Sequence, residues 1–366
     1  MFENRTKDYI QQKAPSTVIP SCMSVPAVKE KFGLETVYKL ASNENPFGVS
    51  PKAVEAMRAA APSGHLYSDG TRDKALIAKL AERNGLQSEN VFIACGAANA
   101  LKHVCDVFVR PNDACVIPSP AYPPYFFWAF KNGGRIVEVP CRACDQTLDT
   151  EAIIAAVDKS AKVIFLCNPN NPTSTALPRE QVVAMLRRLP KDVIVIADEA
   201  YVDFADDPAG LTLVPCLAEF PNLVVVRTFS KIYGMASVRL GYALACPEIT
   251  GYLNKSMDAR SISTFGVEGA IAALDDEEFR QKTIRNNAAE RAYLTEALTG
   301  MGYRVYPSQS NFLWVDFGRP GRAVYNDLLP YGVIIRGDFE FARISIGLHV
   351  ENETLVNALA DIRAKG

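Results

Sequence analysis

The sequence lacks an excess of charge of either sign and lacks any apolar stretch long enough to cross a bilayer. Its 39 basic and 41 acidic residues leave a formal charge of −2 over 366 residues. We therefore expect no nucleic-acid partner, which would require a basic face, and no membrane partner, which would require about 20 consecutive apolar residues. The N-terminus also lacks a basic stretch followed by an apolar core, so we expect a cytoplasmic location.

Histidine is scarce, and cysteine occurs in an odd number. The three histidines, His65, His103 and His349, lie far apart in the sequence, so no metal site is expected. Nine cysteines, scattered mainly within apolar segments, indicate buried thiols in a reducing compartment rather than a disulfide framework. The single CxxC pair, Cys141 and Cys144, has no second pair and no nearby histidine, and we interpret it as structural.

What the sequence does contain, from about residue 88, is an alternation of nearly all-apolar runs with amphipathic stretches. Runs such as VFIAC, KVIFLC and VIVIADEA suit parallel strands covered on both faces, which indicates an α/β architecture. Long charged helices and short strands follow residue 264, as in a smaller α+β domain. Because the chain is longer than one core usually supports, we predict a large domain over residues 46–264 and a small domain from residues 1–45 and 265–366.

The polar residues that follow these strands are the first candidates for a site, because ligands of open α/β sheets bind beyond the carboxyl ends of strands. After VFIAC, Gly96, Ala97 and Ala98 let the backbone approach a ligand, and the N–H groups of the following helix suit a phosphate. Neither GxGxxG nor GxxxxGK[ST] occurs at this turn. A purely structural turn therefore remains an alternative.

A second cluster lies in RTFSKIYGMASVRLGY, where Thr228 and Ser230 flank Lys231 and Arg239 follows. Hydroxyls and a forked guanidinium suit a phosphate, and a lysine that acts as a nucleophile benefits from neighbours that lower its pKa. The alternative is a surface loop with ordinary basic residues.

Asp198 ends the run VIVIAD, where an unpaired carboxylate would be costly, so it needs a cationic partner. A pyridinium N–H would supply that partner. Tyr201, three residues later, and Asn171, in NPNNPTS, can both reach the phenolic oxygen of such a ring. Taken singly, each could instead belong to an ordinary turn.

These motifs together resemble the fold type I, class I/II aminotransferases that depend on pyridoxal 5′-phosphate (PLP), and within them the histidinol-phosphate aminotransferase group. The matching segments cover nearly the whole chain in order: SNENPFG at 42–48, LYSDGT at 66–71, CGAANA at 95–100, PAYPPY at 120–125, NPNNPTS at 168–174, DEAY at 198–201, TFSKIYGMASVRLGY at 228–242, SNFLWVDF at 310–317 and ARISIG at 342–347.

The resemblance implies a three-layer α/β/α large domain with a mostly parallel sheet, PLP as cofactor, and a homodimer with shared active sites. It also implies transfer of an amino group between an amino acid or amine, possibly histidinol phosphate in histidine biosynthesis, and a 2-oxo acid such as 2-oxoglutarate. Two alternatives remain open: an aminotransferase for aromatic or other amino acids, and a PLP-dependent decarboxylase, because the cofactor stabilises the same carbanion in each reaction.

The resemblance also implies roles for single residues. Lys231 would carry the cofactor as a Schiff base and move the α-proton, Asp198 would bind the ring nitrogen, and Asn171 and Tyr201 would bind the phenolic oxygen. Lys231, Asp198 and Tyr201 are thus the expected catalytic residues. The groups expected around the rest of the cofactor are Thr228, Ser230, Arg239 and the N–H groups of Ala97 and Ala98 at the phosphate, Tyr122 stacked on the ring, and Tyr67 reaching the phosphate in the neighbouring subunit.

On the substrate side, Arg343 would bind a carboxylate, while Asn43 and Asn45 would line the entrance. The sequence departs from the group here, because only GDFEFA separates Arg336 from Arg343. That short loop carries Asp338 and Glu340, which would repel a substrate phosphate, and we expect Arg336 to bind substrate. The stretch MDARSIST introduces Arg260, which would bind a second anionic group or face solvent.

Overall fold

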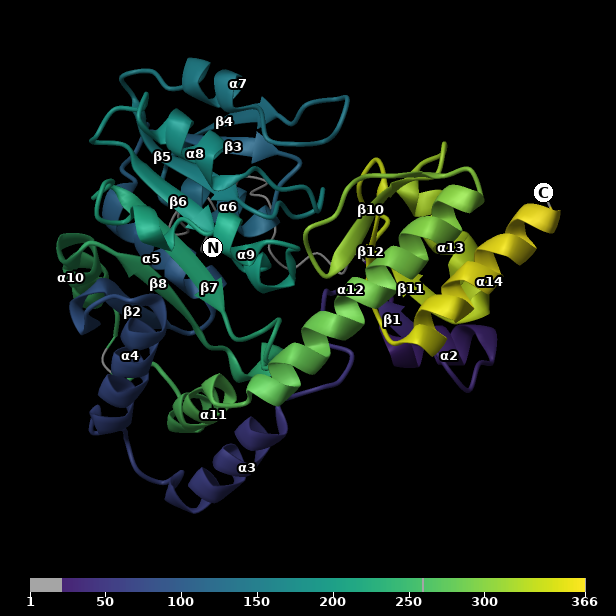
Figure 1. Cartoon of the computed structure of the whole chain (residues 1–366), viewed down its shortest axis with the longest axis horizontal. Coiled ribbons are helices and arrows are strands. Elements are labelled where there is room, and N and C mark those ends of the chain that lie inside the picture. Colours follow the sequence, from purple (N-terminus) through teal and green to yellow (C-terminus); the bar gives the residue numbers. More distant parts are fainter. Residues whose placement is uncertain (1–21, 259, 366) are drawn as a thin grey trace, which may run out of the picture.

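The computed structural model describes residues 22–258 and 260–365, which form a larger and a smaller unit (Figure 1). The larger unit is built on a seven-stranded sheet, and the smaller unit contains two short sheets. Helix α12 (Glu277–Gly300) extends from beneath the larger unit into the smaller one (Figure 1).

The seven-stranded sheet is mostly parallel. Its order is β2 (Val91–Ala94), β8 (Gly241–Ala245), β7 (Leu223–Thr228), β6 (Ile194–Asp198), β5 (Ala161–Cys167), β3 (Ala114–Ser119) and β4 (Arg135–Pro140). Only β8 runs antiparallel to its neighbours. The expectation of a mostly parallel sheet is confirmed.

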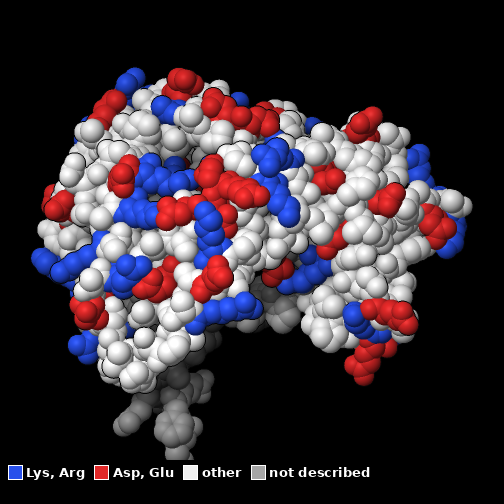
Figure 2. All heavy atoms as spheres, turned by 60° about the horizontal axis from the view of Figure 1, so that its bottom comes forward, with Lys and Arg blue, Asp and Glu red and all other residues white. Residues whose placement is uncertain are grey.

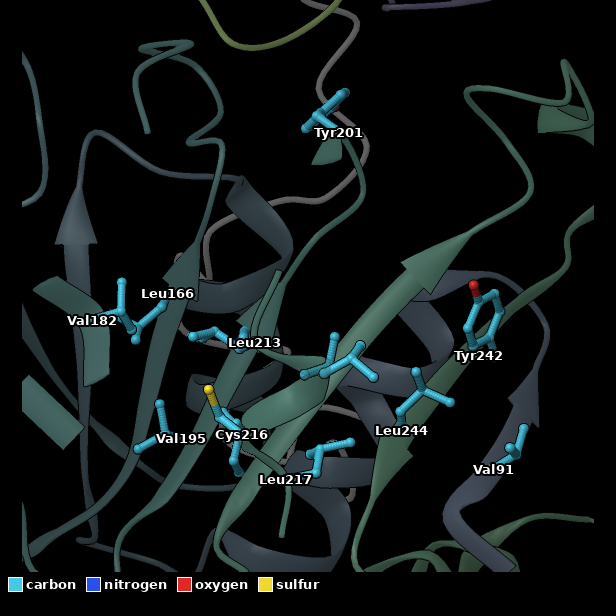
Figure 3. Close-up of a cluster of buried hydrophobic side chains, with 14 of the residues drawn as sticks. Val91, Leu166, Val182, Val195, Tyr201, Leu213, Cys216, Leu217, Tyr242 and Leu244 are labelled. Atoms are coloured by element: carbon cyan, nitrogen blue, oxygen red, sulfur yellow. The ribbon is translucent and has the colours of Figure 1, made fainter. Parts of the chain in front are cut away.

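Both faces of this sheet are buried, which explains the all-apolar runs. In β5, Ile164 and Leu166 belong to one core, while Val163 and Phe165 belong to the core on the opposite face. Figure 3 shows part of the first core, in which Leu166, Val195 and Leu244 extend from β5, β6 and β8. Helices that contribute to the first core include α4 (Thr71–Asn84), α7 (Thr150–Ala155), α8 (Arg179–Leu186) and α11 (Thr264–Leu274); those of the second include α5 (Ala97–Phe108), α6 (Pro123–Lys131) and α10 (Pro247–Ser256). The expected three layers are thus present.

The smaller unit has α+β organisation, as expected. Strand β10 (Phe312–Asp316) pairs antiparallel with β9 (Arg304–Val305) and β12 (Ala342–Ser345), and β1 (Tyr38–Leu40) pairs parallel with β11 (Val333–Ile335). Helices α2 (Val25–Phe32), α12, α13 (Gly321–Leu328) and α14 (His349–Lys365) share its core. The remaining elements are α3 (Pro51–Ala60), α9 (Pro208–Leu211) and the short 3₁₀ helices Ala61–Ser63, Ser88–Asn90, Val202–Phe204, Val214–Cys216, Ala236–Val238 and Leu329–Tyr331.

The domain boundaries at residues 45/46 and 264/265 stay predictions. Strand β1 pairs with β11, as an N-terminal segment of the small domain would. Helix α11, in contrast, packs closely against α3 and α4 beside the larger sheet. Residues 1–21, which the prediction assigns to the small domain, lie outside the described residues.

The surface and the thiols agree with the composition. Basic and acidic side chains are interspersed over the face drawn in Figure 2. In residues 22–258 and 260–365 no helix is long and apolar enough to span a membrane. All nine cysteines are free, and Cys105, Cys115, Cys167 and Cys216 are buried.

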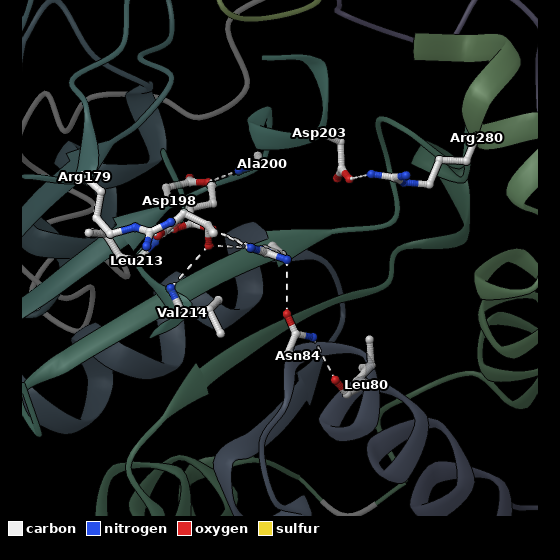
Figure 4. Close-up of polar contacts among 12 residues, drawn as sticks. Leu80, Asn84, Arg179, Asp198, Ala200, Asp203, Leu213, Val214 and Arg280 are labelled. Carbon is white, nitrogen blue, oxygen red and sulfur yellow. Dashed lines mark hydrogen bonds and ion pairs between the residues drawn. The ribbon is translucent and has the colours of Figure 1, made fainter. Parts of the chain in front are cut away.

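A buried ion pair ties together the ends of β6 and β7. Glu199, directly after β6, is 2% exposed and accepts hydrogen bonds of 2.8 and 3.1 Å from the Nη2 and Nε atoms of Arg227 on β7. Thr212 Oγ1 and the backbone N–H of Leu213 also donate to Glu199, and Arg227 Nη1 donates to Asn84 Oδ1 at 3.2 Å (Figure 4). This network fixes the backbone directly after Asp198 and directly before Thr228.

We predict that Glu199→Gln lowers the free energy of unfolding by about 3 kcal/mol, because it leaves the Arg227 guanidinium buried without its counter-charge. Urea titration followed by tryptophan fluorescence measures the loss. The matched control is Glu151→Gln, whose pair with Arg188 is 65% and 53% exposed and whose loss should hardly move the midpoint. Equal shifts for the two variants would contradict the prediction.

Candidate active site

A cavity of about 300 Å³ opens beyond the carboxyl ends of β5, β6 and β7. It lies where the smaller unit meets the larger sheet, because side chains that follow β11 and belong to β12 complete its wall. The sequence-predicted residues that line it are Ala97, Ala98, Tyr122, Asn171, Asp198, Tyr201, Thr228, Ser230, Lys231, Arg239, Arg336 and Arg343. Asn43, expected at the entrance, lines it as well.

Lys231 lies in the loop that follows β7, and its Nζ donates a hydrogen bond of 3.1 Å to the carbonyl oxygen of Ser42. Burial, together with the positive charge of Arg343, lowers the pKa of Lys231 to about 8. A larger fraction of this amine is therefore unprotonated near neutral pH than for an ordinary lysine, which suits a nucleophile or a proton acceptor.

Asp198 is the last residue of β6 and is only 4% exposed. Its Oδ2 accepts a hydrogen bond of 2.7 Å from the Tyr125 hydroxyl, and its Oδ1 accepts one of 3.1 Å from the backbone N–H of Ala200. Burial raises the pKa of Asp198 to about 6. In the part of the chain that the structure describes, no lysine or arginine forms an ion pair with this carboxylate. Asp198 thus offers a negative charge to a cationic group in the cavity.

Tyr125 is a site residue that the sequence interpretation missed. It lies within PAYPPY, but it is fully enclosed and its partner is 73 positions away in the chain. Nothing in the local pattern distinguishes a tyrosine that bonds to Asp198 from one that fills a core.

Two amides converge on the Tyr201 hydroxyl, whose pKa is raised by burial. The Nδ2 atoms of Asn43 and Asn171 donate to its oxygen at 3.2 and 3.3 Å. Asn171 also accepts a hydrogen bond of 2.6 Å from Arg343 Nη1. Tyr201 and Asn171 are therefore held side by side at the wall of the cavity, as two donors to one ligand oxygen would be.

The first turn of α5 faces the cavity without a side-chain cap, because its N-cap residue is Gly96. Gly96 has a positive φ of 91°, and a Cβ there would lie 2.6 Å from Arg239 Nη2. Glycine is thus required for the Arg239 guanidinium to approach the N–H groups of Ala97 and Ala98. Together with the Thr228 and Ser230 hydroxyls, these donors form a cradle that suits a phosphate.

Arg343, on β12, is 5% exposed, and within the described ranges its hydrogen-bond partners are neutral oxygen atoms. Its Nη1 donates to Asn171 Oδ1 and its Nη2 donates to the carbonyl oxygen of Ala41, both at 2.6 Å. Its Nε has no hydrogen-bond partner among the described residues. Burial lowers the pKa of Arg343 to about 10. An anionic ligand group would compensate this charge.

Arg336 also lines the cavity, but its guanidinium is already paired. Its Nε and Nη2 donate to the two carboxylate oxygens of Asp338 at 2.6 and 2.9 Å. The expectation that Arg336 binds substrate stays a prediction.

Asn45 and Tyr67 do not line the cavity. Asn45 Nδ2 donates to the backbone oxygens of Lys231 and Ile232, so this residue supports the lysine loop from outside. Tyr67 lies between α3 and α4, is 81% exposed, and has the Arg260 guanidinium 5.2 Å from its ring centre. Arg260 therefore contacts Tyr67 rather than the cavity of its own chain.

The residues present fit PLP. Asp198 is a buried carboxylate that lacks a cationic partner among the described residues, as the position facing a protonated pyridine nitrogen requires. The uncapped start of α5 beside Arg239 fits the phosphate group. The Tyr122 ring, at the N-terminus of α6, lines the wall between these two places.

Comparisons with known proteins agree with this site. The model of the family described as aminotransferase class I and II matches residues 35–362. The chain is 37% identical over 348 residues to the histidinol-phosphate aminotransferase of Moorella thermoacetica, covering 92% of this chain and 88% of that protein. It is 34% identical over 364 residues to that of Bacillus subtilis, covering 98% and 99%. The crystal structure of histidinol-phosphate aminotransferase from Sinorhizobium meliloti in complex with PLP superposes with a TM-score of 0.89 at 29% identity, covering 99% of this chain and 98% of that one.

We predict that the rate at which the apoprotein takes up PLP rises with pH around a midpoint near 8, because the neutral amine of Lys231 is the reactive form and its pKa is lowered to about 8. Stopped-flow absorbance measures this rate. Arg343→Met should move the midpoint upward, since it removes a neighbouring positive charge. A wild-type midpoint close to the pKa of an ordinary lysine would show that the pKa of Lys231 is not lowered.

Proposed function

Because the chain belongs to the family of class I and II aminotransferases, we propose that it moves an amino group between an amino acid or amine and a 2-oxo acid, with histidinol phosphate as the first donor to test. It is a PLP-dependent enzyme. The observation that carries the proposal is the arrangement of Lys231, Asp198 and Arg343 around one cavity, which combines a proton-transfer amine, a buried carboxylate and an anion-binding guanidinium.

When bound, PLP supplies an electron sink that stabilises negative charge at the substrate Cα. Lys231 Nζ holds the cofactor between turnovers and is the base that accepts the proton from Cα. Its lowered pKa makes it able to take up this proton and return it near neutral pH. Asp198 would bind the ring nitrogen, and its hydrogen bonds from Tyr125 and Ala200 keep the carboxylate oriented.

Tyr201 and Asn171 would bind the phenolic oxygen of the cofactor, and the cradle at the start of α5 would bind its phosphate. Arg343 orients the substrate through its anionic group, a carboxylate in amino and oxo acids. Since Arg343 and Lys231 line the same cavity, a substrate held by the guanidinium presents its Cα side to the amine.

The curated relatives support histidinol phosphate as donor. The Arg336–Asp338 pair favours an amino-acid donor instead, because the Arg336 guanidinium is already paired with the Asp338 carboxylate. A decarboxylase on the same cofactor shell is the remaining alternative.

A single-turnover donor panel tests the proposal. Purified holoenzyme is mixed with histidinol phosphate, aromatic amino acids, glutamate or arginine, and the absorbance of the bound cofactor is followed. We expect at least one donor to convert the cofactor to its amino form, and a 2-oxo acid to reverse the change. Release of carbon dioxide without that conversion would instead support the decarboxylase.

Arg343→Met should lower kcat/KM for a donor with a carboxylate by about 100-fold, the effect of losing a charged hydrogen-bond partner. The control is the same measurement with an amine that carries no anionic group, for which the loss should be small. A similar loss for both donors would show that Arg343 does not bind the substrate carboxylate.

We also propose that the enzyme is a homodimer in which Tyr67 reaches the cofactor phosphate of the neighbouring subunit. Leu66 and Tyr67 are 63% and 81% exposed, and adjacent apolar side chains with such exposure favour an interface. Sedimentation of active holoenzyme as a monomer would contradict this.

The free cysteines support a cytoplasmic location, which recovery of the protein in an exported fraction would contradict.

A further inference from the structure

Arg336 and Arg343 line the same cavity, but only Arg336 is paired with a carboxylate. Arg336 and Arg343 lie opposite each other in an antiparallel bridge and exchange backbone hydrogen bonds of 3.0 and 2.9 Å. Directly opposed residues of an antiparallel pair extend their side chains to the same face, so both guanidiniums line the cavity. Arg343 contacts neutral oxygens, whereas Arg336 is paired with Asp338.

The Arg336–Asp338 pair is well ordered by its surroundings. Both N–H···O bonds are short, at 2.6 and 2.9 Å, and form the two-pronged geometry that is strongest for a guanidinium and a carboxylate. The two side chains are only 21% and 19% exposed. The Phe339 ring lies 5.7 Å from the Arg336 guanidinium and covers it from one side.

The turn that carries Asp338 is held against α13. At Gly337 a Cβ would lie 2.4 Å from the carbonyl oxygen of Gly321, so the backbone is in direct contact with the start of that helix. The Gly321 N–H also donates a hydrogen bond of 3.0 Å to the carbonyl oxygen of Glu340. The backbone on both sides of Asp338 is therefore fixed by its contacts with the start of α13.

Among the described residues that line the cavity, no other cation lies on this side to replace Arg336. A neighbouring cavity of about 310 Å³ shares Phe339 with the first, and its two charged lining residues, Glu138 and Glu340, are both acidic. The other basic residues that line the main cavity, Lys231 and Arg239, lie on the cofactor side. A second negative charge on a substrate would thus meet Asp338 and a guanidinium that is already compensated.

We propose that Asp338 determines the charge selectivity of the cavity. By neutralising Arg336, it leaves Arg343 as the anion-binding group for the substrate and disfavours substrates that carry a second negative charge, such as a second carboxylate. Amino acids with a neutral distal group are the favoured class. This inference rests on the proposed aminotransferase function.

The test compares pairs of donors of nearly equal shape, L-glutamate with L-glutamine and L-aspartate with L-asparagine. The measured quantity is the ratio of single-turnover kcat/KM for the acid to that for the amide. We expect a ratio below one for the wild type. Asp338→Asn should raise it about tenfold, because Arg336 becomes free to bind the second carboxylate. Arg336→Met should lower it, since Asp338 is then left unpaired beside the substrate.

Equilibrium binding gives a readout that does not depend on turnover. Calorimetric titration of the holoenzyme with succinate and with its half-amide, succinamate, gives a second ratio, that of the binding constant of the dianion to that of the half-amide. Asp338→Asn should raise this ratio as well. Asp327→Asn is the matched control. It removes an equal charge from Asp327 on α13, which pairs with Arg319, and it should leave both ratios unchanged.

The outcomes separate the two proposals. If every donor fails in the half-reaction, the aminotransferase proposal fails. If the half-reaction proceeds but Asp338→Asn and Arg336→Met leave both ratios within about twofold of the wild type, the role of Asp338 is overturned. An equal shift in Asp327→Asn would also overturn it.

Discussion

The structure of this site depends on one buried negative charge, the Asp198 carboxylate at the end of β6. The strand lies between β5 and β7 in the sheet, so the residues that follow all three strands meet around it. Burial raises the pKa of Asp198 to about 6, and the hydrogen bonds from Tyr125 and Ala200 fix its orientation without supplying a positive charge. A carboxylate placed in this way destabilises the fold as an anion unless a ligand brings a cation, and the protonated ring nitrogen of PLP is such a group.

The smaller unit adds Arg336 and Arg343 to the wall of the cavity, and we propose that Arg343 binds substrate there. Arg343 comes from β12, yet it hydrogen-bonds to Asn171, which follows β5 of the larger sheet. The two units are therefore coupled through the cavity itself. The two arginines of this unit differ in their partners: Arg343 donates to neutral oxygen atoms, whereas Arg336 is paired with the Asp338 carboxylate. We propose that this difference lets the enzyme distinguish substrates by the number of their negative charges.

Much of this could be predicted from the sequence, because local patterns carry it. All-apolar runs indicated parallel strands, and the strand ends placed Asp198, Asn171 and Lys231 at one edge of the sheet. The order of the motifs indicated the family, which the comparisons confirm. In each of these cases the signal lies within a few residues of the feature that it predicts.

The rest depends on contacts between distant segments or on the choice of a side-chain conformation. Tyr125 bonds to Asp198 across 73 positions, and Asn45 extends toward the backbone of the lysine loop rather than into the cavity. The sequence places Asp338 near Arg336, but it does not show that the carboxylate pairs with this guanidinium. The turn that carries Asp338 packs against α13, and this contact between separate segments places Asp338 beside Arg336.

The most direct test of the central claim is the free energy of unfolding of wild type and Asp198→Asn between pH 4 and 8, with and without PLP. The raised pKa of Asp198 means that the folded apoprotein retains a proton that the unfolded chain has lost, so stability should fall as pH rises through about 6. We predict that the Asp198→Asn apoprotein escapes this fall and exceeds the wild type by about 3 kcal/mol at pH 8, while PLP stabilises the wild type far more than the variant. Parallel pH profiles for the two apoproteins, with equal stabilisation by PLP, would contradict the account.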